Sequence, residues 1–274
     1  MSLTSIDTTT RTLDGLELAG TFVSPETPQH AVLLVHGASV TREEGGFFTR
    51  LAARLTEAGV ASLRFDLPGH GVSEGRQEDF TLSALLNIIR VGLAQLRSLA
   101  DDARTSLIAA SFSGGAAAYY TASRPEDVNR LVLFNPLIDY KKRFIDEKAA
   151  WADDAINDKG AQQLKEQSYV GHGAGFKLGR PLLNEVFWFE ARSALADITA
   201  PTLIVHGTED TFIPVDSSRA APRQLTCEHK LVELSGAQHG FAVHDDPEYA
   251  NPQSQAWQAE VIVEVQRWLT ATPS

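Results

Sequence analysis

The sequence predicts an α/β protein with a mostly parallel central sheet, helices on both faces and a small inserted cap. Short continuous apolar runs, which suit buried parallel strands, alternate with segments whose apolar residues recur at helical spacing. One interval, 138–200, breaks this alternation, and so long a segment inside a compact domain is typical of a lid or cap. We therefore expect a core of residues 1–137 and 201–274 with 138–200 inserted as the cap.

The individual elements follow from local patterns along the chain. Residues 5–24 predict a hairpin around the Asp14-Gly15 turn, which adds antiparallel strands at one edge of the sheet. The apolar runs expected to form the parallel strands are 31–35, 61–67, 106–110, 131–134, 202–205 and 230–234. Apolar residues at helical spacing predict helices over 47–55, 82–96, the Ala-rich stretch after Ser113, and 257–268.

Composition limits the classes of function. The chain has 274 residues, 43% of them hydrophobic, and a formal net charge of -11, which disfavours nucleic-acid binding because phosphate contacts need clustered basic residues. Cys227 is the single cysteine, which fits a reducing compartment. We find no signal peptide and no apolar run approaching about 18 residues, so we expect a cytoplasmic protein without a membrane partner. No metal-ligand spacing or nucleotide fingerprint is present, so we expect no cofactor.

A Ser-x-Ser-Gly-Gly turn separates an apolar run from the Ala-rich helical stretch. A buried strand that turns sharply into a helix exposes one side chain at the tip of the turn. We take Ser113 as that side chain, with Ser111 in the place of the first Gly of a G-x-S-x-G motif. The sequence therefore predicts Ser113 as a nucleophile, although Ser and Gly also occur in ordinary strand–helix turns.

A serine nucleophile needs a base, and the base needs an acid that orients it. Asp210 and Glu209 both follow an apolar run, at the strand end where ligand chemistry occurs in open α/β sheets. His239 follows the next run, and His244 lies five residues further on. Spacing from the strand favours His239 as the base over His244.

An acyl-transfer site also needs hydrogen-bond donors for the oxyanion. The first parallel strand runs into His36-Gly37-Ala38, and we expect the Ala38 N–H to be one donor. The second is the N–H of Gly114, at the start of a helix whose dipole favours negative charge. Backbone donors carry no side-chain signature, so His36-Gly37 can equally be an ordinary turn.

The aromatic residues of the cap are the candidates for substrate contacts. We expect Phe112, Trp151, Phe176 and Trp188 to bind substrate, with the cap rings forming the roof of the pocket. The alternative, that these rings form the cap's own core, is equally open. Glycines between 171 and 179 indicate a short hairpin or a mobile loop.

Five segments together resemble the α/β-hydrolase superfamily over nearly the whole chain. They are His36-Gly37, Arg64–Gly75, the turn at Ser113, His206–Asp210 and Gly236–His239. Within the superfamily the chain is similar to the cinnamoyl and feruloyl esterases in its insertion. It is also similar to the acyl-carrier thioesterases of bacterial bioluminescence in its Ala-Ser-x-Ser turn. The resemblance implies the α/β-hydrolase fold, and the spacing of its His-Gly motif favours Asp210 over Glu209.

The resemblance implies a serine hydrolase that cleaves a small-molecule carboxylic ester through an acyl-enzyme. His239 would take the proton of Ser113, and Asp210 would orient the imidazole. One alternative is a thioesterase or acyltransferase acting on acyl-carrier or coenzyme A thioesters, with an acyl-carrier protein as partner and the basic residues 141–143 at the site's mouth. Another is a ligand-binding protein without catalysis.

Overall fold

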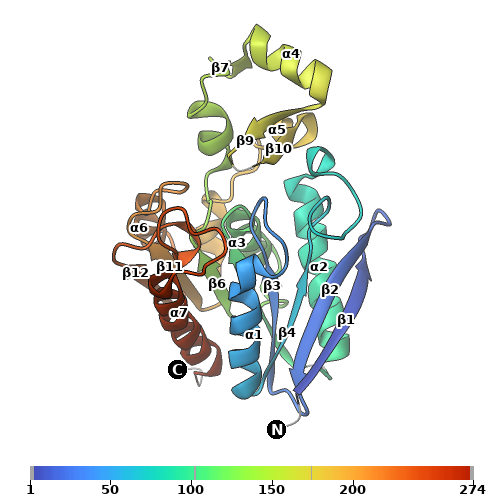
Figure 1. The fold of residues 1–274 in the computed structure, drawn as a ribbon, viewed down its shortest axis with the longest axis vertical. Helices are drawn as coiled ribbons and strands as arrows, with labels where there is room; N and C mark the ends of the chain where they lie inside the picture. The colour runs from blue at the N-terminus through green and yellow to red at the C-terminus, as the bar shows by residue number, and fades with distance from the viewer. Residues whose placement is uncertain (1–2, 102, 174, 272–274) are drawn as a thin grey trace.

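The computed structural model describes residues 3–101, 103–173 and 175–271. In this part of the chain the main sheet has eight strands in the spatial order β1-β2-β4-β3-β5-β6-β11-β12 (Figure 1). The strands are β1 (Leu3–Arg11), β2 (Glu17–Pro25), β3 (His30–Val35), β4 (Val60–Phe65), β5 (Arg104–Ala110), β6 (Leu131–Phe134), β11 (Thr202–Gly207) and β12 (His229–Leu234). The β1–β2 and β2–β4 pairs are antiparallel and all the others are parallel, which confirms the predicted sheet with its antiparallel edge.

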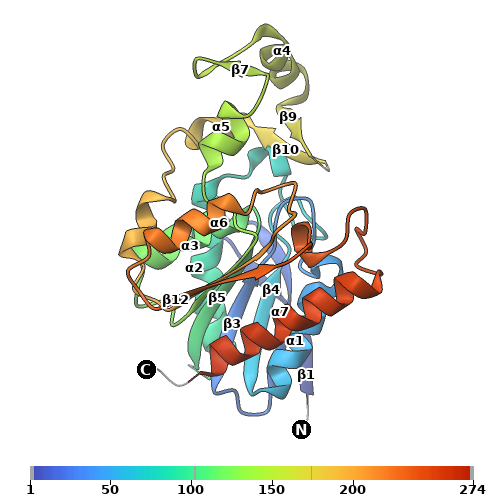
Figure 2. The ribbon, with the colours of Figure 1, turned by 90° about the vertical axis from the view of Figure 1, so that its left-hand side faces the viewer.

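Helices cover both faces of this sheet, as Figures 1 and 2 show. The longer ones are α1 (Phe47–Glu57), α2 (Leu82–Leu99), α3 (Ser113–Ser123) and α7 (Pro252–Thr270), and the short α6 is Asp216–Ala220. Successive side chains of a strand point to opposite faces. Leu34 of β3 accordingly belongs to the cluster with α1 and α7, whereas its neighbour Leu33 belongs to the cluster with α2 and α3.

Helix α2 forms because a capped start precedes a regular apolar stripe. The Thr81 hydroxyl accepts the Ala84 N–H at 3.0 Å, and the stripe, which includes Leu85, Ile89 and Leu93, is fully buried. By length and composition this helix could cross a membrane, contrary to the expectation that no apolar run is long enough. In the structure its stripe belongs to the apolar cluster between the sheet and α3, as in a core helix.

Besides the hairpin that the glycines indicated, the segment predicted as a cap contains regular structure that the sequence did not reveal. Its elements are η3 (Lys142–Asp146, a π-helical turn), β7 (Trp151–Ala152), β8 (Ala155–Ile156), α4 (Asp158–Gln167), β9 (Tyr169–His172), β10 (Phe176–Gly179), α5 (Arg180–Glu185) and η4 (Ser193–Asp197). The antiparallel β9–β10 pair confirms the expected hairpin. Both views place the cap at the end of the molecule farthest from the two termini. The division into a core and a cap domain stays a prediction.

One side chain of the cap fastens it to the core. The Glu185 carboxylate accepts the N–H groups of Leu82 and Ser83, at 2.5 and 2.9 Å. These two N–H groups lie in the first turn of α2 and have no hydrogen-bond partner within the helix, and the helix dipole favours an anion there. The short helical turns outside the predicted cap are η1 (Glu44–Gly46), η2 (Gln77–Asp79), η5 (Ala221–Arg223) and η6 (His239–Phe241).

Candidate active site

The turn between β5 and α3 presents Ser111 to solvent. Strand β5 ends at Ala110, so Ser111 is the first residue of the turn, and its φ of 54° lies in the left-handed region. A residue other than glycine is strained in this conformation, and such strain is common at functional sites. The Ser111 N–H donates to the Phe134 carbonyl of β6 at 2.8 Å, which holds the strained turn at the sheet. Its hydroxyl therefore projects from the end of the strand.

The prediction that Ser113 faces the imidazole of His239 is wrong. Ser113 is the first residue of α3, its side chain is fully buried, and its hydroxyl donates to the His36 carbonyl at 2.7 Å. Ala109 and Ser113 therefore occupy the two glycine positions of the G-x-S-x-G motif, where small side chains let the start of the helix approach the sheet. The apolar run ends at Ala110 in the sequence, but only the backbone of the turn shows that Ser111 and not Ser113 projects from it.

Three side chains from separate loops form one hydrogen-bonded line. His239 Nδ1 lies 2.6 Å from Asp210 Oδ2, and His239 Nε2 lies 2.9 Å from Ser111 Oγ. The carboxylate can only accept, so Nδ1 carries the proton, and Nε2 is left to accept the Ser111 hydroxyl. This is the arrangement of nucleophile, base and orienting acid found in serine hydrolases.

Asp210 is held in place by more than the histidine. Its Oδ1 accepts the N–H groups of Phe212 and Ile213, at 2.8 and 2.9 Å, and the His206 Nε2 lies 3.4 Å from Oδ2. Burial raises the pKa of the Asp210 carboxyl. Its interactions with His206, His239 and the Ile213 N–H lower that pKa more strongly, and the net pKa is well below the ordinary value. The orienting group is therefore a carboxylate at neutral pH.

The rival residues lie outside this line. Glu209 is exposed at the surface, next to the buried Asp210. The His244 imidazole is 71% exposed and pairs with the carboxylate of Asp245 at 3.5 Å. The geometry therefore selects Asp210 and His239 as the partners of Ser111.

Two backbone N–H groups beside Ser111 are suited to bind an oxyanion. Ala38 and Phe112 both line the cleft at Ser111, and within the described residues no hydrogen bond engages either N–H. The expected donor Gly114 is excluded, because its N–H donates to the Ser111 carbonyl at 3.0 Å. The sequence did not predict Phe112 as an oxyanion donor. The second donor follows the nucleophile in the chain, so placing the nucleophile at Ser113 instead of Ser111 moved the predicted donor from Phe112 to Gly114.

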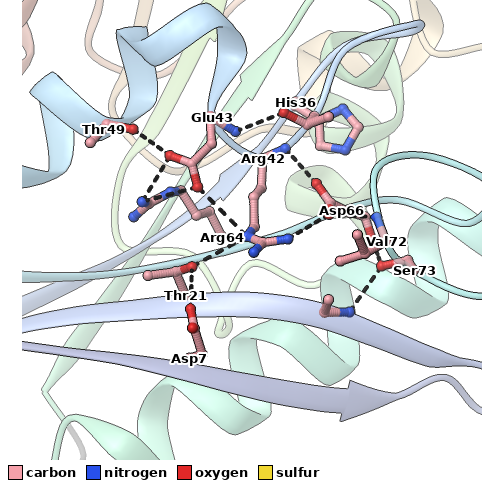
Figure 3. A network of polar contacts seen from close by, with 12 residues as sticks. Asp7, Thr21, His36, Arg42, Glu43, Thr49, Arg64, Asp66, Val72 and Ser73 are labelled. Carbon is pink, nitrogen blue, oxygen red and sulfur yellow. Dashed lines mark hydrogen bonds and ion pairs between the residues drawn. The ribbon is translucent and has the colours of Figure 1, made fainter.

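A network of charged side chains fixes the loop that carries Ala38 (Figure 3). The Arg42 N–H donates to Asp66 Oδ1 at 2.7 Å, and the Arg42 guanidinium pairs with the same buried carboxylate. On the other side, Arg64 pairs with Glu43 at 3.0 Å. A side chain at Gly71, whose φ is 51°, would place its Cβ 2.2 Å from Asp66 Oδ2. The motif 64–75 thus serves to hold this loop at the end of the sheet.

A cleft of about 560 Å³ opens beside Ser111 and His239. Phe112 and Phe176, both predicted to contact substrate, lie on its wall together with Phe144 of the cap. The Phe112 ring centroid lies 5.1 Å from that of Phe176 and 6.1 Å from that of Phe144. The cap therefore supplies an apolar wall directly beside the nucleophile position.

The two tryptophans predicted to bind substrate do not line this cleft. Trp188 is 87% exposed. Trp151 lies in β7, and its ring packs against Phe187 with centroids 5.8 Å apart. Spacing along the chain could not show which aromatic residues of the cap reach the cleft.

Two of the basic residues at the start of the cap, Lys141 and Arg143, differ in their ion pairs and in their position relative to the cleft. Lys141 is paired with two carboxylates, those of Asp146 and Asp154, each at 2.7 Å. Arg143 lines the cleft, and its nearest carboxylate, that of Glu147, lies 3.5 Å away. In the part of the chain that the structure describes, no group of three or more His, Cys, Asp or Glu side chains is placed to hold a metal ion.

A strained serine at a strand–helix turn, followed in the chain by an acid and a histidine at later strand ends, defines the α/β-hydrolase class of proteins. The family model described as "Alpha/beta hydrolase family" matches residues 32–251, and the chain belongs to this family. The expected α/β-hydrolase fold is thereby confirmed.

The chain shares only low sequence identity with the individual relatives described next. A monoacylglycerol lipase of Mycolicibacterium smegmatis is 27% identical over 75% of this chain and 79% of its own length. An uncharacterized protein of Mycobacterium tuberculosis is 32% identical over 38% of this chain, and the match spans 28% of that protein. Among solved structures, Est1E of Butyrivibrio proteoclasticus with bound ferulic acid superposes with a TM-score of 0.71 at 24% identity, over 92% of this chain and 97% of that one. The resemblance to acyl-carrier thioesterases stays a prediction.

Proposed function

We propose that the protein is a serine hydrolase that cleaves carboxylic esters, with Ser111 as nucleophile, His239 as base and Asp210 as orienting acid. The hydrogen-bonded line from Asp210 through His239 to Ser111, with contacts of 2.6 and 2.9 Å, carries this proposal. The named activity of the lipase relative supports ester hydrolysis.

The reaction would run in two acyl-transfer steps. Ser111 Oγ attacks the ester carbonyl while its proton passes to His239 Nε2, and the N–H groups of Ala38 and Phe112 stabilise the oxyanion. Collapse of this intermediate breaks the ester bond, and the leaving alcohol takes the proton from Nε2. Water then attacks the acyl-enzyme as His239 takes its proton, and His239 passes that proton to Ser111 Oγ as the acid leaves.

We favour carboxylic esters over coenzyme A thioesters as the substrates. Lys141, one of the basic residues expected to bind coenzyme A, is already held by Asp146 and Asp154. The wall formed by Phe112, Phe144 and Phe176 is apolar and suits an alkyl or aryl group. Matched oxygen and thiol esters of one acyl group measure the preference directly, and a higher kcat/KM for the thioester would favour the thioesterase alternative.

Ser111→Ala and Ser113→Ala form a matched pair that tests the nucleophile. With p-nitrophenyl esters we expect Ser111→Ala to lower kcat by about 10⁴-fold or more, because the attacking atom is lost. Ser113→Ala removes only a buried hydrogen bond and should retain activity within about tenfold. Loss of activity in Ser113→Ala with full activity in Ser111→Ala would refute the assignment.

Covalent labelling gives an independent readout. A fluorophosphonate probe should modify the folded protein once, and mass spectrometry should locate the adduct on Ser111. Folded protein that forms no adduct and hydrolyses no ester would indicate the ligand-binding alternative.

A further inference from the structure

Glu44 is a buried acid that the triad does not use. Glu44 lies in the turn η1, six residues after Ala38, and is 7% exposed. Its backbone φ is 46°. Gly45 and Gly46 follow with φ values of 59° and 87°. A strained backbone and a buried carboxylate both oppose folding, so their combination beside a catalytic site indicates a functional constraint.

The Glu44 carboxylate holds the backbone that precedes the oxyanion donor. Glu44 Oε1 accepts the Gly37 N–H at 2.8 Å, and the next N–H along the chain is that of Ala38. Gly37 itself lies against the nucleophile turn, since a Cβ built on it would be 2.9 Å from the Ser111 Cβ. The Glu44–Gly37 bond therefore holds the residue just before the Ala38 N–H against the turn of Ser111, while His36 Nδ1 contacts the Gly37 carbonyl at 2.7 Å.

The same carboxylate faces the catalytic side chains. Glu44, Ser111, His239 and Tyr249 line one small cavity of about 60 Å³ behind the cleft. The Tyr249 ring packs against Gly45, and the Tyr249 hydroxyl packs against Gly240. A Cβ atom at either glycine would clash with Tyr249. The other charged or titratable groups near this cavity and His239 include Asp210, His206, Asp246 and Arg50. The adjoining cleft adds Arg143, His172, His244 and Asp245.

Burial raises the pKa of Glu44, while the Gly37 N–H and the charge of His239 lower it, and the net shift is upward. A folded-state pKa above the unfolded one means that ionisation of Glu44 costs folding free energy as the pH rises past its ordinary value of 4.5. Replacement by glutamine should therefore leave the fold at least as stable at neutral pH.

We propose that Glu44 is a positioning residue of the acyl-transfer site, which holds the Ala38 N–H toward the oxyanion and presents a negative charge to the His239 imidazole. This inference rests on the proposed esterase function. It assigns two separable effects to one carboxylate, a hydrogen bond and a charge.

Glu44→Gln separates these effects, because its amide oxygen can still accept the Gly37 N–H while the charge is lost. We expect kcat at the pH optimum to stay within about threefold of wild type. The acid limb of the kcat/KM profile should move about 0.5 to 1 pH unit lower, because the protonated imidazole loses an attractive charge. A purely structural role would not move this limb.

Glu44→Ala removes both effects and should lower kcat about 10- to 100-fold with little change in KM, since the oxyanion donor is displaced but not deleted. Glu57→Gln is the matched control, because Glu57 is an exposed acid at the end of α1 that pairs with Arg54 and lines neither the cavity nor the cleft. It should leave kcat and the pH profile unchanged.

Melting temperatures of all three variants show whether each is folded. An unshifted acid limb in folded Glu44→Gln, or wild-type kcat in folded Glu44→Ala, would overturn the proposal for Glu44. Wild-type protein without Ser111-dependent ester hydrolysis would instead overturn the proposed function, so the two failures are distinct.

Discussion

Ser111 and Ser113 are two residues apart, yet backbone conformation gives them different chemistry. Ser111 occupies a left-handed turn and faces His239, whereas Ser113 begins α3 and donates to the His36 carbonyl inside the protein. A hydroxyl that is already committed to a buried carbonyl cannot reach a substrate. Residue type alone does not distinguish the two serines. Their positions in the folded turn do, because Ser111 directly follows β5 and Ser113 begins α3.

The Asp210 carboxylate should affect both activity and the pH dependence of stability. Asp210→Asn should lower kcat about 10⁴-fold, because an amide cannot hold the imidazole in the required tautomer. The carboxyl pKa is depressed on folding, so its stabilising contribution is complete above the ordinary value of 3.8 and declines as the pH falls below it.

Thermal unfolding across pH tests this expectation. The difference in melting temperature between wild type and Asp210→Asn should shrink as the pH falls from about 5 to about 2. Glu209→Gln, which changes an exposed neighbour, should show no such dependence. A constant difference across this range would contradict the depressed pKa.

At the scale of elements, the hairpin β9–β10 and the turn η3 bring cap side chains to the cleft. Phe176 opens β10 and is buried against Phe112, while Phe144 of η3 lies on the same wall. Trp188 lies beyond α5 and is exposed. Phe144 and Phe176 are therefore placed to contact an acyl or aryl group of a substrate in the cleft, whereas Trp188 is not.

Phe176→Ala and Trp188→Ala test this separation. Phe176→Ala should lower kcat/KM for aryl or long-chain esters about tenfold or more, with a smaller effect on an acetyl ester, because apolar contact with the substrate is lost. Trp188→Ala should leave both rates near wild type. An equal loss on all esters in Phe176→Ala would indicate a role in folding instead.

Arg143 of η3 should influence the preference for charged substrates. Its guanidinium lines the cleft beside Phe144, and its pair with Glu147 is long and partly exposed. Arg143→Gln should lower kcat/KM for a monomethyl dicarboxylate by about tenfold relative to the uncharged methyl ester of equal length. The ratio of the two rates measures this effect, and an unchanged ratio would exclude a role in substrate charge selection.

At the scale of the whole molecule, the network of Figure 3 joins residues in or next to β2, β3 and β4 to the loop that carries Ala38. Asp66 follows β4, Arg42 lies in the loop after β3, and the Arg42 guanidinium also donates to Thr21 of β2 at 3.2 Å. Removing one partner of a buried ion pair leaves the other charge uncompensated. The network therefore couples the stability of the sheet to the position of the active-site loop.

Asp66→Asn should lower the free energy of unfolding by about 3 kcal/mol, since Arg42 loses its buried counter-charge. Glu57→Gln provides the comparison, because the exposed pair of Arg54 and Glu57 should contribute less than about 1 kcal/mol. Urea denaturation measures both. Equal, small changes in the two variants would show that the buried pair is not a major stabilising contact.

By itself the sequence predicted the sheet, its main helices and His239, because strand and helix periodicities and strand-end spacing are local signals, and the family resemblance of the His206–Asp210 motif added Asp210. The tertiary structure alone decided between Ser111 and Ser113, replaced Gly114 with Phe112 as the second candidate oxyanion donor, and excluded Trp151 and Trp188 from the cleft. It also brought Glu44 to the Gly37 N–H. These outcomes depend on backbone dihedral angles and on contacts between distant segments, which residue type and spacing along the chain do not specify.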